Sequence, residues 1–347
     1  MTEMNERISI QKFIETLLDD ASPEVDIIMN RFSDLEESDL AALKEIWPQV
    51  NLPRRKRIMF DLKEIAENDL LVCFDNVALM GLEDSDPDVR VNAISLLWEY
   101  ENKSLIPTLI QMMKEDPAKS VRAAAATGLG KFIYLGEIED IPTEAYSQAE
   151  NALLDTINSK DDKEVRQHAL EAISFSCHKA AQDEIRKAFA STDSTWVASA
   201  MFSMGRSADK RWTDRVLENL DHHESDVQLA AIIAAGELEI EEAREPLLLL
   251  LEKSTYLDED LQRTITWSLS QIGGENVRAA LEYLLEIAEQ EEDDTETVEF
   301  IEAAIENLEF NEGLLFPDLF DFDLNDEDDF HDLTGINGEM TDYEEEE

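Results

Sequence analysis

A ten-residue pattern that recurs through most of the chain constrains its fold more than any other sequence feature. The pattern is clearest in Val121–Gly130, where small or apolar residues occupy offsets 0, +4, +7 and +8. These offsets fall on one side of a helix with about 3.6 residues per turn, so the segment is expected to be a helix with one buried face. Alanine and glycine on that face allow a neighbouring helix to approach closely. The repeated unit therefore contains a helix that packs tightly against another.

Six copies of the pattern can be aligned by the residue that begins each one. Their first residues are Val89, Val121, Val165, Trp196, Val227 and Leu261, with spacings of 32, 44, 31, 31 and 34 residues. Position +4 is occupied by Ala93, Ala125, Ala169, Ala200, Ala231 and Ile265. Position +8 is occupied by Leu97, Leu129, Ile173, Met204, Ala235 and Leu269. The alignment predicts an array of repeats, and weaker copies that begin at Arg54 and Thr297 bring the array to about eight units.

Each copy is preceded by an acidic turn and, before that, by a second amphipathic helix. The turns contain Asp84–Asp88, Asp161–Asp162, Asp193–Ser194, Asp226 and Asp258–Asp260. Aspartate is suited to cap a helix N-terminus, so we expect these residues to be N-caps. The preceding helices are expected at Leu105–Lys114, Gln182–Phe189, Val216–Leu220 and Pro246–Glu252. The longest spacing should place its extra residues near Tyr134–Thr143, where Gly136 and Pro142 would interrupt the helix.

The two ends of the chain lack the repeat. Residues 1–50 contain expected helices at Ile10–Leu18 and Asp39–Trp47, and we predict that they form a helical cap, because an end repeat would otherwise expose its apolar side. Residues 51–310 form the predicted array. Residues 311–347 contain 15 acidic residues, several phenylalanines and no lysine or arginine. This composition predicts a disordered acidic tail.

The repeats resemble HEAT repeats, in particular the short bacterial kind also seen in phycobiliprotein lyases. The resemblance is carried by Asp86–Ala93, Ser120–Gly130, Asp161–Ser174 and Asp226–Gly236, and it covers about residues 50–310. It implies an all-α fold, a right-handed α-solenoid of helix-turn-helix repeats whose second helices line a concave binding surface. The arginine that follows the first residue of each repeat in the family is present as Arg90, Arg122 and Arg166, whereas Val197, Gln228 and Gln262 replace it later. The inter-repeat polar ladder that the resemblance implies is therefore expected only in the N-terminal half.

The net charge of the chain limits the classes of molecule that it can bind. It carries 81 acidic and 29 basic residues, for a net charge of −52, and its only dense basic run is Arg54–Arg57. Such a field repels nucleic acids and anionic lipid head groups and attracts basic proteins. No apolar stretch approaches the ~18 residues that span a bilayer, and Met1–Ile10 lacks the features of a signal peptide. We therefore expect a cytoplasmic protein that binds neither nucleic acid nor membrane.

The sequence contains few candidate catalytic or metal-binding residues. Iron-dependent deoxyhypusine hydroxylases, which share the HEAT fold, carry several His-Glu pairs, whereas this chain has only His223-Glu224, in a polar turn. Cys73 and Cys177 lie on apolar stretches and are interpreted as buried small residues. We predict no catalytic residue, cofactor or metal, and hence no enzyme. A bilin-lyase-like or metal-dependent HEAT enzyme is the alternative.

One acidic run in the tail has the spacing of a calcium-binding loop. Its EF-hand-like positions are occupied by Asp321, Asp323, Asn325, Glu327, Asp329 and Asp332. Asp326 stands where the loop needs a glycine, and the last position is aspartate rather than the bidentate glutamate. We interpret the run as part of the acidic tail.

The candidate binding residues lie at offsets +2 and +6 of the inner helices, opposite the buried face. In the C-terminal repeats they are Phe202, Leu229, Ile233, Arg263 and Trp267. Phe202, Ile233 and Trp267 occupy equivalent positions and would form an apolar strip, unless neighbouring repeats bury them. We predict a scaffold or adaptor that binds a protein partner, basic or with an amphipathic segment, on its concave face. The alternative binding function is an acidic chaperone or nucleic-acid mimic for a basic protein.

The tail carries a segment that could occupy the same strip. Its apolar anchors are Leu315, Phe316, Leu319 and Phe320. We expect that this segment docks on the concave face until a partner displaces it. Charge repulsion between the acidic tail and the acidic array opposes this docking, so only the apolar anchors or nearby arginines could offset it.

Overall fold

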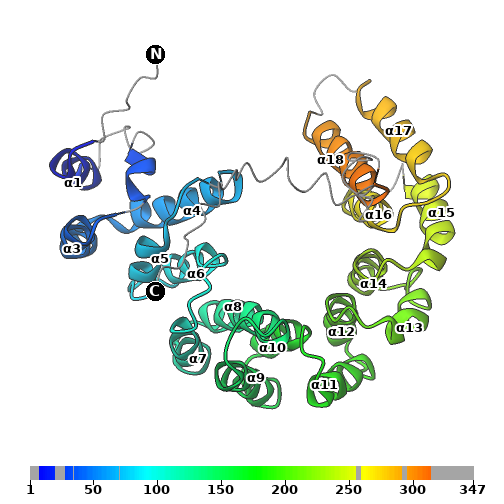
Figure 1. Cartoon of the computed structure of the whole chain (residues 1–347), viewed down its shortest axis with the longest axis horizontal. Helices are drawn as coiled ribbons and strands as arrows, with labels where there is room; N and C mark the ends of the chain where they lie inside the picture. Colours follow the sequence, from blue (N-terminus) through cyan, green and yellow to red (C-terminus); the bar gives the residue numbers. More distant parts are fainter. Residues whose placement is uncertain are drawn as a thin grey trace, which may run out of the picture. The chain divides into compact units, whose positions relative to one another are not determined.

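The computed structural model describes residues 8–19, 28–33, 35–69, 71–254, 259–290 and 295–313. These residues form α-helices and short 3₁₀-helices, and they contain no β-strand. The predicted all-α fold class is confirmed. The chain divides into two compact units, Met1–Leu247 and Leu248–Glu347, whose helices can be followed by colour in Figure 1. None of the described helices is long and apolar enough to cross a lipid bilayer.

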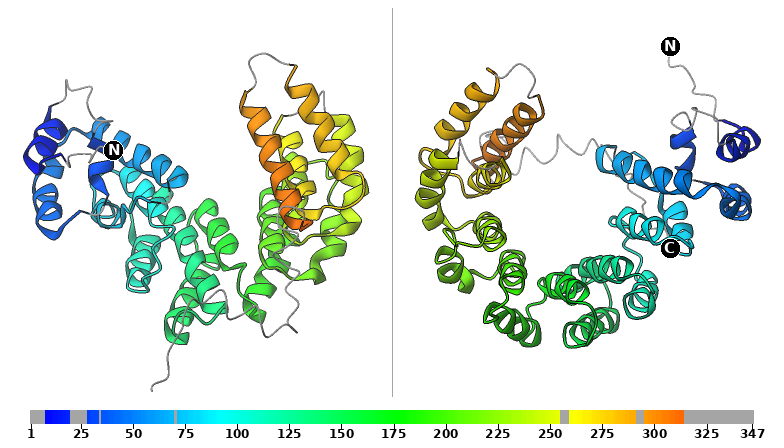
Figure 2. Two further views of the ribbon diagram at one scale, coloured as in Figure 1. Left: turned by 45° about the horizontal axis from the view of Figure 1, so that its top comes forward. Right: turned by 180° about the vertical axis from the view of Figure 1, so that it is seen from behind.

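The first unit is built from two layers of helices. The inner helices are α4 (Leu52–Asn68), α6 (Pro87–Leu96), α8 (Lys119–Glu137), α10 (Lys163–Ile173), α12 (Ser194–Arg206) and α14 (Ser225–Glu237). The outer helices are α5 (Asp75–Gly81), α7 (Leu105–Glu115), α9 (Thr143–Ile157), α11 (Lys179–Phe189) and α13 (Thr213–Leu217). Successive inner helices pack side by side, and each outer helix packs on the inner helix that follows it. The inner layer lines the inside of the arc that this unit forms, as Figure 2 shows from two further directions. This is the predicted solenoid of helix pairs.

Shorter elements precede the first unit's layers. They are α1 (Ile10–Leu18), η1 (Met29–Phe32), α3 (Glu37–Ile46) and η2 (Trp47–Gln49). The rings of Phe13 and Phe32 meet edge to face at 4.9 Å. Arg54 of α4 donates to the carbonyl oxygens of Thr16 and Leu17, at 2.6 and 3.2 Å, and so satisfies orphan acceptors at the C-terminal end of α1.

The second unit continues the helix pairs. Its helices are α16 (Glu259–Ile272), α17 (Val277–Ala288) and α18 (Thr295–Asn311), and α15 (Arg244–Ser254) crosses the boundary between the units. Both α16 and α17 pack against α18. The helix expected at Pro246–Glu252 is α15, which begins two residues earlier.

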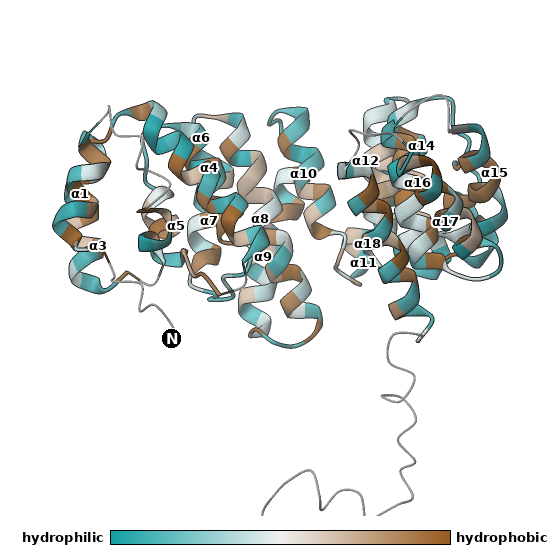
Figure 3. Ribbon diagram, turned by 90° about the horizontal axis from the view of Figure 1, so that it is seen from above, coloured by the Kyte–Doolittle hydropathy of each residue, from teal (hydrophilic) through white to brown (hydrophobic). Residues whose placement is uncertain are grey.

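The repeated positions form the core. Every +4 residue, from Ala93 to Ile265, is fully buried, and the +8 residues are at most 3% exposed. Hydrophobic and hydrophilic residues along the helices are coloured brown and teal on the ribbon in Figure 3. Glycine allows two inner helices to approach closely: a Cβ on Gly130 would lie 3.2 Å from the Cα of Ala172, and one on Gly205 would lie 2.8 Å from the Cα of Ala234. The repeated residues thus form the contacts between neighbouring helices.

The helix is interrupted within Tyr134–Thr143, as expected, at residues 138–142, which follow Gly136 and include Pro142. Helix α8 runs through Gly136 and ends at Glu137, and α9 begins directly after Pro142. The glycine is needed for space, because a Cβ at this position would overlap the ring of Tyr146 on α9. The extra residues therefore lengthen α8 and α9 instead of forming a long loop.

Three of the acidic turns cap helices as predicted. The side chains of Asp86, Asp162 and Asp193 accept hydrogen bonds from backbone N–H groups at the starts of α6, α10 and α12. Asp226 does not do so, because α14 begins at Ser225 with Glu224 at the N-cap position. Asp226 instead lies in the first turn, where its charge still suits the helix dipole.

The predicted polar ladder is present. Arg90 makes two hydrogen bonds to the carboxylate of Asp116, at 2.8 and 2.9 Å, and Arg122 makes two to Asp161, at 2.7 and 2.9 Å. Each arginine reaches the acidic turn before the next inner helix. Arg55 extends the ladder backwards, since its guanidinium lies 2.5 Å from the carboxylate of Asp84.

The ladder ends at the third predicted arginine. Arg166 donates to the carbonyl of Ile157 at 2.8 Å, and its guanidinium lies 5.1 Å from the ring centroid of Trp196. A cation–π contact thus takes the place of the carboxylate pair. In the next repeat but one, Gln228 donates to the carbonyl of Leu220 at 3.0 Å. The loss of the ladder toward the C-terminus agrees with the sequence.

Both cysteines are exposed, so the interpretation of them as buried residues is wrong. Cys73 precedes α5, and Cys177 lies in the turn between α10 and α11. The apolar stretches around them extend past the ends of the helices. Although each cysteine is close in sequence to a helix, its thiol does not lie in the core.

Candidate functional site

The candidate binding residues of the first unit lie on α12 and α14, two inner helices that pack against each other. Phe202, Leu229 and Ile233 are half-buried. The residue two positions after each of them is fully buried. Each helix thus turns one face into the core and leaves the apolar side chains of the other face accessible. That this accessible face binds a partner stays a prediction.

The two remaining candidates lie on α16 in the second unit. Trp267 is 40% exposed, and its ring centroid is 6.3 Å from that of Phe300 on α18. The guanidinium of Arg263 lies 4.3 Å from the same Phe300 centroid and 3.4 Å from the carboxylate of Glu296. Arg263 and Phe300 also line a cavity of 440 Å³ between α16, α17 and α18. Phe300 therefore shares the surface that the sequence assigned to Arg263 and Trp267.

A larger groove in the first unit is lined in part by a buried, hydrogen-bonded acidic turn. It has a volume of 870 Å³, and its lining includes Trp47, Met80, Tyr100 and Met112. At its floor the indole N–H of Trp47 donates to Asp84 at 2.7 Å, and Asp84 also receives the ladder arginine. The buried charge is fully paired, so the floor holds the first acidic turn in place.

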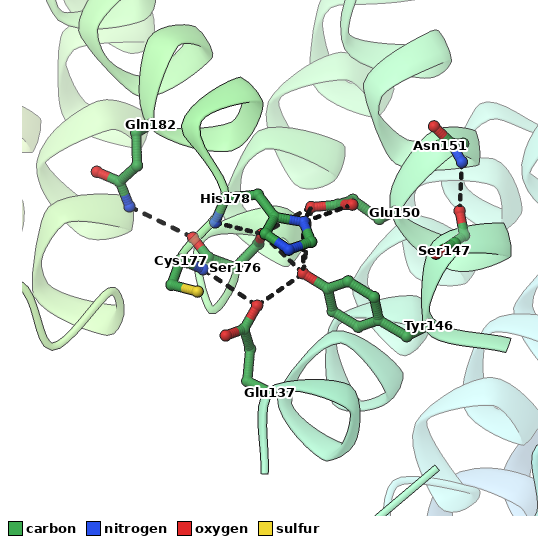
Figure 4. Close-up of polar contacts among 9 residues, drawn as sticks. All are labelled: Glu137, Tyr146, Ser147, Glu150, Asn151, Ser176, Cys177, His178 and Gln182. Atoms are coloured by element: carbon green, nitrogen blue, oxygen red, sulfur yellow. Dashed lines mark hydrogen bonds and ion pairs between the residues drawn. The ribbon is translucent and has the colours of Figure 1, made fainter. Parts of the chain in front are cut away.

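A polar network fills the space that the lengthened helices α8 and α9 create (Figure 4). The hydroxyl of Tyr146 donates to Glu137 at 2.6 Å. The hydroxyl of Ser176 donates to Glu150 at 2.7 Å, and Nδ1 of His178 lies 2.9 Å from the same carboxylate. Tyr146, Glu150 and Ser176 are buried, whereas His178 is exposed at the surface. The network joins α8 and α9 to the turn before α11.

Hydrogen bonding sets the protonation of this network. Burial raises the pKa of Tyr146, and its bond to Glu137 raises it further, so the phenol stays protonated. Burial also acts to raise the pKa of Glu137, but hydrogen bonds from Cys177 and Tyr146 outweigh it and lower that pKa. The bond to Glu137, together with burial, raises the pKa of the Cys177 thiol. The network therefore holds one carboxylate ionised and keeps the adjacent thiol in its less reactive form.

The other chemistry-bearing residues are dispersed. His223 is 3.6 Å from Glu224 in an exposed turn, and His168 pairs with the hydroxyl of Thr127 at 3.0 Å. Within the described ranges, no group of three or more histidine, cysteine, aspartate or glutamate side chains could hold a metal ion. The tail anchors Leu315, Phe316, Leu319 and Phe320, and the acidic run at 321–332, lie outside the described residues.

The sequence alignment missed the network and several exposed aromatic residues because it compared the repeats only up to offset +8. Tyr134, Phe175 and the network residues lie beyond that offset or in the connecting turns. A signal was present, since Trp98, Tyr134 and Phe175 each stand near the C-terminal end of an inner helix. Extending the alignment by a few positions would have found them.

Comparison with known proteins identifies the repeat. Residues 77–143, from α5 to the start of α9, match the family model of HEAT repeats. A search of curated proteins found no match.

Several solved structures are similar. The complex of CpcE and CpcF of phycocyanin lyase from Nostoc sp. PCC7120 is 20% identical and aligns over 67% of this chain and 94% of that chain, with a TM-score of 0.44. The Escherichia coli protein YibA is 17% identical over 83% of this chain and 97% of that chain, with a TM-score of 0.42. Human deoxyhypusine hydroxylase is 12% identical over 76% and 95%, with a TM-score of 0.31. These scores are too low to support an argument about function.

Proposed function

We propose that this chain, a HEAT-repeat protein, is a scaffold or adaptor that binds another protein on the inner face of its helix array, and that it is not an enzyme. One observation carries the proposal: the inner helices α12 and α14 have accessible apolar side chains opposite a face that is already fully packed. These are Phe202, Leu229 and Ile233. Accessible apolar residues on a polar protein surface favour an interaction site.

The second unit supports the same function on its own inner helix. Trp267 and Phe300 present aromatic surface beside the cationic Arg263. Aromatic and arginine side chains are enriched at the centres of protein interfaces. An amphipathic segment of a partner fits such a surface because it offers apolar anchors and polar flanks.

A charge-led function is the second candidate, favoured by the net charge of −52. In that case the protein would be an acidic chaperone or a nucleic-acid mimic for a basic protein. The two functions differ in their response to salt. Binding led by charge weakens strongly by about 0.5 M salt, whereas binding led by apolar anchors persists.

The experiment is affinity capture from a lysate of the native cells with wild type and with the double variant Leu229→Asp, Ile233→Asp. We expect the variant to lose proteins that wild type retains at high salt. Leu249→Asp is the matched control, because Leu249 is 55% exposed on an outer helix. If the double variant captures the same proteins as wild type, the inner face of α12 and α14 is not the binding surface.

Enzymatic function is tested separately. The carboxylates of Glu137 and Glu150 are engaged by neighbouring hydroxyl, amide and imidazole groups. Metal analysis and a visible absorption spectrum of the purified protein check the alternative of a metal-dependent or bilin-lyase-like enzyme. A stoichiometric metal or a bound chromophore would overturn the non-enzymatic proposal.

A further inference from the structure

Three aromatic side chains stand at the C-terminal ends of successive inner helices in the first unit. Trp98 follows α6, Tyr134 lies in the last turns of α8, and Phe175 follows α10. Trp98 is 45% exposed and Tyr134 is 48% exposed, while Phe175 is half-buried. We call Trp98, Tyr134 and Phe175 the aromatic edge.

Contacts link the residues of the edge to one another or to neighbouring inner helices. The rings of Tyr134 and Phe175 meet edge to face, with centroids 5.7 Å apart. Lys131, one turn before Tyr134 on α8, donates its ammonium group to the carbonyl oxygen of Trp98. On the other side, the guanidinium of Arg206 on α12 lies 5.1 Å from the ring centroid of Phe175.

One ring of the edge, Phe175, already contacts a cation of its own chain, Arg206. Arg206 lies near two rings at once, since its guanidinium is also 4.8 Å from the centroid of Phe202. Both distances are within the range of about 6 Å over which an aromatic face attracts a cation. The rings at this edge therefore have the environment that a guanidinium group prefers. The exposed parts of Trp98 and Tyr134 offer the same kind of surface to a second molecule.

The charges around the edge also favour a cation. Glu99 and Glu101 follow Trp98 in the sequence, and Glu139 and Asp140 follow Tyr134; all four are exposed. The C-terminal ends of helices add partial negative charge from their terminal carbonyl groups. Basic groups at this position are the chain's own Lys131 and Arg206, which are both engaged. A nucleic acid or an anionic lipid surface would be repelled here, and a purely apolar partner would have to desolvate the carboxylates.

We infer that the aromatic edge docks an arginine-bearing segment of a protein partner, whose guanidinium groups stack on the rings of Tyr134 and Trp98 between the flanking carboxylates. The inference names a second surface and a partner chemistry. It rests on the proposed function only in assuming a protein partner, because its residues are different from Leu229 and Ile233 on the inner face.

The test uses a fluorescent peptide of three Arg-Gly-Gly units, with binding to the full chain followed by anisotropy at about 0.15 M salt. The same peptide with citrulline in place of arginine keeps the shape but removes the charge, so we expect it not to bind. The double variant Trp98→Leu, Tyr134→Leu keeps apolar side chains but removes the two exposed rings. We expect it to bind the arginine peptide about tenfold more weakly, which is the combined effect of two cation–π contacts.

Three controls make the result specific. Tyr283→Leu removes an aromatic ring that is 62% exposed on α17, and it should leave the affinity unchanged. Tyr134→Leu alone leaves Trp98 in place and should weaken binding about threefold. The slope of affinity against salt concentration should stay the same in all variants, because leucine and tyrosine carry no charge at neutral pH.

Equal affinity of wild type and both Tyr134 variants would overturn the inference and assign the binding to the general acidic field. Binding of the citrulline peptide with the affinity of the arginine peptide would overturn it as well. The variant Leu229→Asp, Ile233→Asp separates this result from the proposed function. It should retain the arginine peptide even where it loses the native partner.

Discussion

At the scale of single residues, the arginine ladder gives the first unit its most specific bonds. Arg90 and Arg122 each make paired hydrogen bonds to an aspartate and a further bond to a carbonyl of the acidic turn before their own helix. For Arg90 the carbonyl is that of Asp84, at 2.7 Å, and for Arg122 it is that of Asp116, at 2.8 Å. One side chain thus ties together two turns from neighbouring repeats.

Removing a ladder arginine should be costly. The side chains of Arg90 and Asp116 are 10% and 9% exposed, so Arg90→Met leaves a buried carboxylate without its partner. We expect a loss of about 3 kcal/mol in the free energy of unfolding, measured by urea denaturation. Lys119→Met is the matched control, because the Lys119–Glu164 pair is about half exposed and should contribute little to the free energy of unfolding. Equal losses in the two variants would contradict this role of the ladder.

The ladder also predicts a dependence of stability on pH. The hydrogen bond from Arg122 lowers the pKa of Asp161, although burial acts in the opposite direction. A lowered folded-state pKa stabilises the fold above the unfolded-state value of about 3.9, and this contribution disappears as the pH falls through the folded-state pKa.

We therefore expect Asp161→Asn to be less stable than wild type at pH 6 by about 1–2 kcal/mol, with the difference shrinking below about pH 4. Urea unfolding across a pH series measures the difference. Comparing the two proteins at each pH cancels the effect of the many other carboxylates. A difference that stays constant down to about pH 3 would show that Asp161 does not titrate as a ladder partner.

At the scale of elements, close approach of inner helices is the main packing device. Gly205 on α12 faces the backbone of Ala234 on α14, which cannot move without shifting the helix. Gly128 on α8 instead faces side chains, since a Cβ there would lie 3.2 Å from a methyl group of Ile94 and 3.4 Å from one of Leu109. Side chains can adjust where backbone cannot. The same residue type thus has different importance in two repeats.

Substitution by alanine should have different effects on stability at these two glycines. In an ordinary helix position Gly→Ala stabilises by about 1 kcal/mol. We expect Gly205→Ala to destabilise by about 2 kcal/mol, because α12 and α14 must separate, and Gly128→Ala to change stability by under about 1 kcal/mol. Thermal and urea unfolding of both variants measure this. Stabilisation by Gly205→Ala would mean that the helices have room to spare.

The repeat pattern predicted these elements well because each offset has one physical meaning. Small or apolar residues at +4 and +8 must be buried for the helices to meet, and all of them are. The polar network around Tyr146 was not predictable in the same way, because its members come from α8, α9 and a turn and share no period. The interruption after Gly136 was predicted but its close contact with Tyr146 was not, since a glycine near a proline indicates a turn equally well as a close contact.

At the scale of the whole molecule, charge is the dominant property. A net charge of −52 on 347 residues means that folding brings like charges together. Although ion pairs such as those of the ladder offset part of this repulsion, most carboxylates have no basic counterpart, as 81 acids outnumber 29 bases. The composition alone predicts this excess of charge. The structure was needed to find the surfaces where carboxylates lie beside aromatic side chains.

Salt should therefore stabilise the protein. Raising sodium chloride from about 10 mM to about 200 mM shortens the range of repulsion from about 30 Å to under about 10 Å. We expect the melting temperature to rise by several degrees, since repulsion between surface carboxylates opposes folding. Sucrose at equal osmolality is the control for non-ionic effects. A melting temperature that falls with salt would mean that the ion pairs outweigh the repulsion.

Because the ladder ends at Trp196, low pH should affect the contacts between repeats unequally along the first unit. Ahead of α10, largely buried arginine–aspartate pairs join neighbouring repeats, and protonation of the aspartate removes each pair. Between α10 and α12 the ladder position is a stacked ring, which acid does not change, and the Lys163–Asp193 pair, at 3.0 Å, is about half exposed. Acid should therefore weaken the contacts between repeats more ahead of α10 than directly after it.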